Sequence, residues 1–583
     1  MKKGLLTASI LVFVLMMAAC GANEAPAPQP AAPAAPAADA PAAQVGGVAM
    51  ADSNVTQPGV LPIVYEPVTL TIGLSENMLV SDYYDNALTR YLEELTGVNI
   101  EFVFYAEGAD GNTQLNLQVA AGADLPDLLY QLGIEAAATR EAFGNAGAII
   151  PLNDFIRDLG YFTNRAVSQT DIYLAGQDPW IFGVSGDGNI YGYMVYHNPL
   201  GVLQSSRAWY NADFAEYLGF SEDDWTGGLP NYPIPTYDWF LSFLRAVRDN
   251  DANQNGDMFD EIPLTGGTGW RQQLPRWVMQ MFIYDDYAGT NQFWMVRNGE
   301  LDVTYNKPEF REGLRFLNMM FNEELFHDFS LTQAGPGLTA TVNQQPHRVG
   351  ITVSGGVGIY DDEARQKLRP MPVVEGPGGF ISTNYHLQIP TFPWAISSNS
   401  RHPEVAFRFL DAMASSPDFP IYTRYGVRDL DWRTPEPGEI SIYDGIIDLE
   451  PYIVQLQMTW GAAVTDSHWK TAFGIDYMNR LSSLAWNGDP LDPEFMHAQA
   501  IRRAIPYAPS EFPINLNWTG AELERWAETR VTVRNFVDQS VAEFITNQRC
   551  IETEWDSYLA TLENMGALDL LEADREVHRR MTQ

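Results

Sequence analysis

The sequence predicts an α/β protein with two lobes. Between residues 69 and 130, predicted strands alternate with predicted helices, which is typical of a mainly parallel sheet. More than 500 of the 583 residues follow an N-terminal region of unusual composition, and a globular stretch of that length can bury two cores. The content of 46% hydrophobic and 12% aromatic residues is typical of a globular chain.

The first 20 residues have the pattern of a secretory signal. Lys2 and Lys3 precede an apolar run that is too short to span a bilayer, and the run ends in Ala18, Ala19 and Cys20. Small residues directly before a cysteine are what lipoprotein processing requires. We therefore expect a lipid on Cys20, which would place the protein on the extracellular face of the cell membrane. Cleavage near Ala19 with release of the protein is the alternative.

Residues 21–64 are rich in alanine and proline and include repeats of Pro-Ala-Ala. Such a segment cannot bury a core, so we expect a semi-extended tether. After it, the alternating elements are strands at 69–74 and 98–105, helices at 86–95 and 115–121, and a third strand that ends at Tyr130.

An amphipathic helix is predicted at 237–248 because its apolar residues recur at helical spacing. An acidic loop follows, and it presents oxygen-bearing side chains around Gly256, which can take a positive φ. Ca²⁺ requires six to eight oxygen ligands. We expect such a site from side-chain oxygens of Asp251, Asn253, Asn255, Asp260 and Glu261 and from the backbone carbonyl of Asp257. A solvated acidic turn is the alternative.

The formal net charge of −39 argues against nucleic acid as a partner, because the surface repels phosphates. Only two cysteines are present, so a lipid on Cys20 leaves Cys550 without a partner. No G-x-S-x-G, H-E-x-x-H or P-loop motif occurs, and we predict no enzymatic activity. The acidic pairs Asp223-Asp224 and Asp285-Asp286 resemble the acidic dyad of a glycosidase, but in so acidic a chain we expect solvated turns.

Several ordered motifs resemble those of the extracellular solute-binding lipoproteins of bacterial ABC importers, in their carbohydrate-binding branch. The acidic loop with the D-E-I-P-L-T sequence of 260–265 resembles a loop that holds structural Ca²⁺ in that branch. Further similarity lies in the T-G-V turn at 96–98, in A-G-A-D-L-P-D-L-L at 121–129, in D-G-N-I-Y-G at 187–192, in a helix at 209–219 and in segments 308–326, 403–411 and 424–432. The resemblance spans about residues 67–432.

The resemblance implies a type II-like periplasmic-binding-protein fold with hinge crossovers near 195–203, 369–373 and 394–398. Lobe one would then comprise 65–197 plus 370–396. Lobe two would comprise 198–369 plus 397–583, and the C-terminal part would be mainly helical. A ligand would bind in the crevice between the lobes.

A sugar-binding crevice needs flat aromatic faces and planar polar groups. Tyr130 and Gln131 lie at the end of the third predicted strand, and Trp270 and Arg271 follow a glycine-rich turn. The other two candidates are Trp394, in the last expected crossover, and Trp432, in the segment 424–432. For each aromatic residue taken singly, a place in the core is the favoured interpretation, but we expect at least two members of the group to face the crevice.

The resemblance implies a monomeric receptor that binds a carbohydrate, expected to be an oligosaccharide, and delivers it to the permease subunits of an ABC transporter. Two alternatives stay open. One is a receptor for a peptide or another solute. The other is a secreted, calcium-containing enzyme that degrades polysaccharides.

Overall fold

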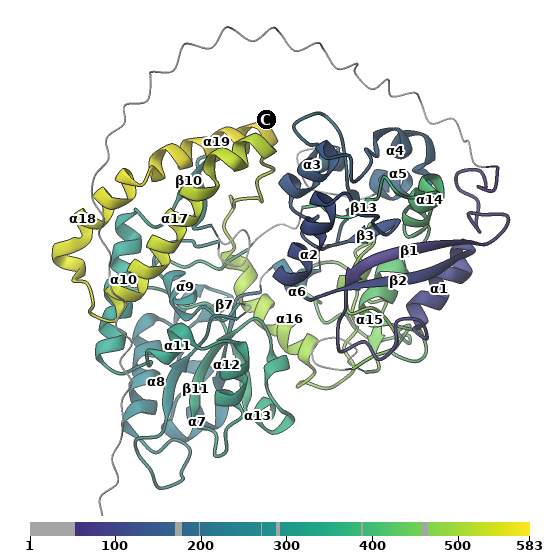
Figure 1. Ribbon diagram of the computed structural model, residues 1–583. Coiled ribbons are helices and arrows are strands. Elements are labelled where there is room, and N and C mark those ends of the chain that lie inside the picture. Colours follow the sequence, from purple (N-terminus) through teal and green to yellow (C-terminus); the bar gives the residue numbers. More distant parts are fainter. Residues whose placement is uncertain are drawn as a thin grey trace, which may run out of the picture. The chain divides into compact units, whose positions relative to one another are not determined.

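The computed structural model of the protein describes residues 53–169, 178–197, 199–203, 205–269, 271–286, 292–385, 389–457 and 464–582 (Figure 1). The predicted signal, Cys20, most of the predicted tether and Trp270 lie outside these ranges. Within the described ranges, no helix combines the length and the apolar character needed to cross a bilayer.

Lobe one is built on a five-stranded sheet with the order β2-β1-β3-β13-β4. The strands are β1 (Val68–Ser75), β2 (Val98–Tyr105), β3 (Leu128–Tyr130), β13 (Thr391–Ile396) and β4 (Tyr193–Val195). Strand β1 runs parallel to β2 and β3, whereas β13 is antiparallel to β3 and β4. The predicted alternation of strands and helices is therefore confirmed in this lobe.

The helices of lobe one begin and end where local residues favour it. In α1 (Ala87–Thr96), the side chain of Asn86 caps the start by accepting from the Leu88 amide, and Gly97 ends the helix at φ 75°. Its buried face includes Leu88 and Leu92, which pack in the same core as β1. The other helices are α2 (Ala109–Ala120), α3 (Ala137–Asn145), α4 (Asn153–Leu159) and α5 (Tyr161–Gln169).

Lobe two has a four-stranded sheet with the order β12-β5-β11-β8. Its strands are β12 (Leu368–Met371), β5 (Arg207–Asn211), β11 (Val349–Ser354) and β8 (Ile262–Thr265). The predicted amphipathic helix is confirmed as α8 (Tyr237–Asp249), which buries Phe240, Leu241, Phe243, Leu244 and Val247. Further helices are α7 (Ala212–Leu218), α9 (Leu274–Met279), α10 (Pro308–Asn322), α11 (Phe329–Thr332), α12 (Gly335–Val342) and α13 (Asp362–Gln366). Two hairpins complete the lobe: β6 (Gly227–Leu229) pairs with β7 (Tyr232–Ile234), and β9 (Trp294–Arg297) pairs with β10 (Glu300–Val303).

The segment expected to be one helix at 209–219 is a strand followed by a helix. Trp209 and Tyr210 lie in β5, which pairs with strands on both sides. Asn211 then caps α7, because its side chain accepts from the amides of Asp213 and Phe214. The pairing of β5 in the sheet, which is a long-range interaction, decides the structure of these residues.

The chain returns from lobe two to lobe one between β12 and β13, and it stays in lobe one through residue 425. Helix α14 (Pro403–Ala412) packs against α4, α5 and β13, and its apolar residues lie in the core of lobe one. Helix α15 (Phe419–Tyr425) contributes Phe419 to the same core. The crossover expected near 394–398 is thus absent from this stretch, and 397–425 packs with lobe one, because an amphipathic pattern does not say which sheet a helix will cover.

The later chain is mainly helical, as predicted. A small hairpin of β14 (Trp432–Arg433) and β15 (Val454–Gln455) precedes α16 (Pro493–Ala504). Ala498 and Ile501 of α16 lie in one apolar cluster, whereas Met496 and Ala500 lie in another with residues of lobe two. The helices α17 (Gly520–Ile545), α18 (Ile551–Asn564) and α19 (Ala567–Thr582) follow.

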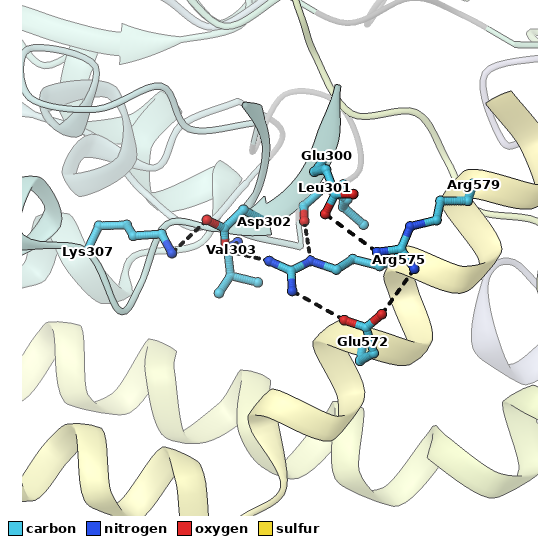
Figure 2. Close-up of polar contacts among 8 residues, drawn as sticks. All are labelled: Glu300, Leu301, Asp302, Val303, Lys307, Glu572, Arg575 and Arg579. Carbon is cyan, nitrogen blue, oxygen red and sulfur yellow. Dashed lines mark hydrogen bonds and ion pairs between the residues drawn. The ribbon is translucent and has the colours of Figure 1, made fainter. Parts of the chain in front are cut away.

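The last three helices are attached to lobe two. Helix α17 packs against α10, and α19 packs against β10. Figure 2 shows that Arg575 of α19 donates to the carbonyl oxygen of Leu301 at 2.8 Å, while Arg579 forms ion pairs with Glu300 and Glu572. The carboxylate of Asp302 holds Lys307 at 2.7 Å.

The tether ends earlier in the chain than expected. Val55 and Val64 form a β-bridge, and both are buried in the core of lobe one together with Ile63. The buried guanidinium of Arg408 donates to the carbonyl oxygen of Thr56 at 2.7 Å. Residues 55–64 therefore belong to the folded lobe, because their apolar side chains and their backbone both find partners in it.

Candidate functional site

Three parallel strands of lobe one end at the same edge of the sheet, and a cavity of about 300 Å³ lies there. The carboxyl ends of parallel strands are where α/β proteins usually bind ligands. We call this the strand-end cavity. It is lined by Leu74, Ser75, Glu76, Asn77, Glu107, Gly108, Asn112, Tyr130, Gln131, Leu132, Glu135, Trp469, Lys470 and Thr471.

Two predicted residues line this cavity. Tyr130 is the last residue of β3, and its hydroxyl lies 2.6 Å from the hydroxyl of Thr471. Burial raises the pKa of Tyr130, so its hydroxyl stays protonated and can act as donor or acceptor. Gln131 is exposed and has a φ of 59°, and the buried Leu132 has a φ of 55°. Both therefore adopt the left-handed conformation that is uncommon for residues with a side chain. Such backbone conformations concentrate at functional sites.

The segment 469–471 supplies the wall that the sequence did not predict. The indole of Trp469 is buried and donates to the hydroxyl of Thr89 at 2.8 Å. Lys470 has φ 57° and its amide donates to Nδ1 of His468 at 3.0 Å, so the backbone of the segment is held in place. Burial lowers the pKa of Lys470.

The cavity is polar and has more acidic than basic side chains. Glu76, Glu107 and Glu135 line it, whereas Lys470 is its one cation among the described residues. The remaining polar groups are hydroxyls and amides, which can each donate and accept hydrogen bonds. This chemistry suits a ligand with many hydroxyl groups and without negative charge.

The other predicted aromatic residues occupy the core. Trp394 is fully buried in β13, with its ring centroid 4.3 Å from that of Tyr130. Trp432 is also fully buried, and its indole donates to the carbonyl oxygen of Gly426 at 3.0 Å. Neither ring presents the open face that stacking on a sugar requires.

The Trp270-Arg271 pair is described only in part. Arg271 is half-buried at φ 57° and does not line the strand-end cavity, and Trp270 is outside the described residues. The glycines before them allow close packing, because a Cβ on Gly266 would lie 2.5 Å from the carbonyl oxygen of Gln272.

Lobe two has its own cavity of about 310 Å³ beside Thr268. The two arginines that line it are already paired, Arg276 with Asp285 and Arg534 with Asp538.

The acidic loop brings most of its predicted ligands together. The amides of Asn255 and Gly256 donate to the carboxylate of Asp251 at 2.9 and 2.8 Å. The side chains of Asn253 and Asn255 both contact the carboxylate of Asp260. The carboxylate of Asp257 accepts from the Phe259 amide, whereas the expected ligand from this residue is its backbone carbonyl.

Glu261 is the buried member of the loop. Its Oε1 accepts from the Asn253 amide at 3.2 Å, whereas Oε2 is buried and has no hydrogen-bond partner. Burial raises the pKa of Glu261. The donor set therefore fits a hard cation in composition, although no three acidic, histidine or cysteine side chains within the described ranges are close enough to form a metal-binding group on their own.

Comparisons with known proteins agree with this fold. Residues 79–418, more than half of the chain, match the family described as bacterial extracellular solute-binding protein. The fructooligosaccharide ABC transporter substrate-binding protein FusA of Streptococcus pneumoniae is 22% identical over 511 residues, which cover 84% of this chain and 86% of FusA.

Solved structures have the same architecture. FusA in complex with kestose has a TM-score of 0.68 and 19% identity, covering 88% of this chain and 99% of that one. An EF-hand mutant of FusA in complex with fructo-nystose has a TM-score of 0.67, with the same identity and coverage. A solute-binding protein from Bifidobacterium longum infantis, described as HMO-binding and associated with an ABC transporter, has a TM-score of 0.68 and 13% identity, covering 89% of this chain and all of that one. The predicted two-lobed fold is confirmed.

Proposed function

Because this chain belongs to the bacterial extracellular solute-binding proteins, we propose that it is the receptor of an ABC importer and binds an oligosaccharide in the strand-end cavity. The polar lining of that cavity at the ends of three parallel strands carries this proposal. FusA, by its description, is the substrate-binding protein of a fructooligosaccharide ABC transporter, which supports the same ligand class. The receptor releases its ligand to permease subunits and performs no chemistry on it.

Tyr130 and Gln131 are the residues of lobe one that we assign to the ligand, together with Thr471 on the facing segment. The hydroxyl pair of Tyr130 and Thr471 and the amide of exposed Gln131 offer hydrogen bonds to sugar hydroxyls. Trp270 and Arg271, which follow the glycine-rich turn of lobe two, stay predicted ligand residues. Closure of the two lobes over the ligand would produce the form that the permease recognises.

Titration calorimetry of the purified protein tests the ligand class. Neutral kestose and nystose should bind at least tenfold more tightly than uronate oligosaccharides of equal length, because the carboxylates of Glu76, Glu107 and Glu135 repel the carboxylates of a uronate. The difference should shrink in 1 M salt. The double variant Glu76→Gln/Glu107→Gln should reduce the difference in affinity between neutral and uronate oligosaccharides. The control Glu216→Gln, which removes a carboxylate of α7 outside the cavity, should leave this difference unchanged.

Binding of uronates as tightly as neutral sugars would contradict the charge argument. Binding of peptides, with no response to any sugar, would show that the receptor takes a different solute. Release of reducing sugar by the purified protein would show that it is an enzyme.

We also propose that the acidic loop holds a structural Ca²⁺. The ligands are oxygens of Asp251, Asn253, Asn255, Asp260 and Glu261, with a contribution from the backbone carbonyl of Asp257. The buried Oε2 of Glu261 without a partner supports this assignment, and so does the description of one FusA structure as an EF-hand mutant. The bound ion would offset the mutual repulsion of the loop carboxylates.

Removal of the ion should lower the melting temperature. Binding to the folded state alone stabilises by RT ln(1 + [L]/Kd), or about 2.7 kcal/mol at a hundredfold excess over Kd. Ca²⁺ should restore the chelated protein better than Mg²⁺, which resists a shell made only of protein oxygens. Asp251→Ala should abolish the response, whereas Asp249→Ala, just before the loop, should retain it. Equal melting of chelated and Ca²⁺-loaded protein, with no bound metal found by elemental analysis, would contradict the site.

Finally, we propose that a lipid on Cys20 anchors the receptor to the membrane. The mature protein should then sediment with membranes, and Cys20→Ala should move it to the soluble fraction or stall the precursor. Cys550→Ala is the matched control, because Cys550 is the exposed free thiol at the start of α18. Equal fractionation of Cys20→Ala and the parent protein would exclude the anchor.

A further inference from the structure

A second cavity adjoins the strand-end cavity. Its volume is about 330 Å³, and Glu135 lines both cavities. Its walls come from the start of α3, from the chain leading into β13 and from the segment 515–523 that opens α17. We call it the side cavity. Alone, each cavity is at the lower end of the size range of small-molecule sites, whereas together they are large enough for an extended ligand.

A buried arginine lines the side cavity. Arg140 is 2% exposed, and its Nη1 donates to the carbonyl oxygens of Ile134 and Glu135 at 2.9 and 2.8 Å. The guanidinium lies 5.3 Å from the ring centroid of Phe392, another residue of the cavity wall. No ion pair holds Arg140 among the described residues, and its buried Nε has no hydrogen-bond partner.

This arginine is suited to an oxygen-rich ligand. Burial lowers the pKa of Arg140 to about 10, which still leaves it charged at neutral pH. Its Nη2 donates no hydrogen bond among the described residues, and a planar guanidinium with such a donor binds oxygen acceptors, including the hydroxyls of a sugar. Leu516 and Trp518 supply apolar surface on the facing wall.

The facing wall is fixed at both ends. The Gly520 amide donates to the carboxylate of Glu141 on α3 at 2.7 Å, which ties the segment to lobe one. The guanidinium of Arg580 on α19 bonds both the Glu522 carboxylate, at 2.7 Å, and the carbonyl oxygen of Asn517, at 3.0 Å. Helix α19 is itself attached to lobe two by the contacts of Figure 2. The side cavity is therefore a feature of the packed fold.

We propose that the side cavity is a second binding subsite, which receives the sugar units of an oligosaccharide that extend past Glu135 from the strand-end cavity. Arg140 donates to hydroxyls of these units, and the segment 515–518 packs against them. This inference rests on the proposed function, and it adds that the preferred ligand has more than two sugar units.

Calorimetry with a length series tests the subsite. The probes are sucrose, kestose and nystose, with maltose, maltotriose and maltotetraose as a second neutral series. Affinity should rise at least tenfold from the disaccharide to the tetrasaccharide in the series that binds. Asn515→Trp should remove most of that rise by filling the side cavity and leave the disaccharide affinity within twofold, since exposed Asn515 lines only the side cavity.

Leu117→Trp is the matched control, because Leu117 is 66% exposed and lines neither cavity. Arg140→Lys keeps the charge but loses the planar donors, and it should reduce tetrasaccharide affinity more than disaccharide affinity in protein that melts as a folded chain. Equal affinity at all lengths, with no effect of Asn515→Trp, would overturn the second subsite and leave the carbohydrate proposal standing. Absence of binding by every member of both series would overturn the subsite and count against the proposed function as well.

Discussion

Trp394→Ala should lower the free energy of unfolding by about 3–5 kcal/mol, which is the usual cost of removing a large aromatic side chain from a core. The indole is fully buried in β13, 4.3 Å from the ring centroid of Tyr130 and 5.6 Å from that of Phe473. Removing it leaves a cavity that these two rings cannot fill by small movements. Urea denaturation of the variant and the parent protein measures the difference.

Trp394→Phe separates a core role from a ligand role. The phenyl ring keeps most of the packing, so sugar affinity should stay within about twofold of the parent protein if Trp394 only supports the sheet. A tenfold loss of affinity without a change in stability would instead place Trp394 at the ligand. Tyr217→Ala is the aromatic control, because Tyr217 is 53% exposed and its loss should change stability by no more than about 0.5 kcal/mol.

Local patterns in the sequence predict most elements of the two lobes. The alternating residues at 98–105 form β2 with those bounds, and the helical spacing of Phe240, Leu244 and Val247 matches the buried face of α8. Such patterns report which face of an element is buried, but not which neighbour covers it. This is why α14 is found in the core of lobe one, and why Trp209 and Tyr210 lie in a strand.

The sequence predicts the part of the candidate site that β3 supplies, but not the walls that come from later segments of the chain. Tyr130 and Gln131 follow from a general rule, since ligands bind at the carboxyl ends of parallel strands. Thr471 contacts Tyr130 across 341 residues of sequence, and no local pattern around it indicates that contact. The side-cavity wall at 515–518 is equally remote from α3 in the sequence. Aromatic residue type alone did not separate Trp394 and Trp432, which are buried, from residues that reach a cavity.

The acidic pair Asp285-Asp286 also differs from the sequence-based expectation of a solvated turn. Both side chains are fully buried in lobe two, and Arg276 of α9 lies beside them. Its guanidinium binds both carboxylate oxygens of Asp285, including Oδ2 at 3.0 Å, and lies 3.8 Å from the ring centroid of Phe293. The Trp294 amide also donates to the Asp286 carboxylate at 3.2 Å, so burial of the two carboxylates depends on packing with other elements of lobe two, which spacing in the sequence does not reveal.

Arg276→Met should therefore destabilise the protein by about 3–5 kcal/mol, because it removes the guanidinium that pairs with two adjacent buried carboxylates. The double variant Arg276→Met/Asp285→Leu should recover part of the loss, since it removes one of the two buried charges. Arg245→Met is the control: its bidentate pair with Glu323 is partly exposed, and the loss should be about 0–1 kcal/mol. Urea denaturation of the four proteins at neutral pH measures these differences. If Arg276→Met lowers the free energy of unfolding no more than Arg245→Met does, then solvent reaches Asp285 and Asp286. The two aspartates would then again be candidates for an acidic dyad, which a hydrolase assay would test.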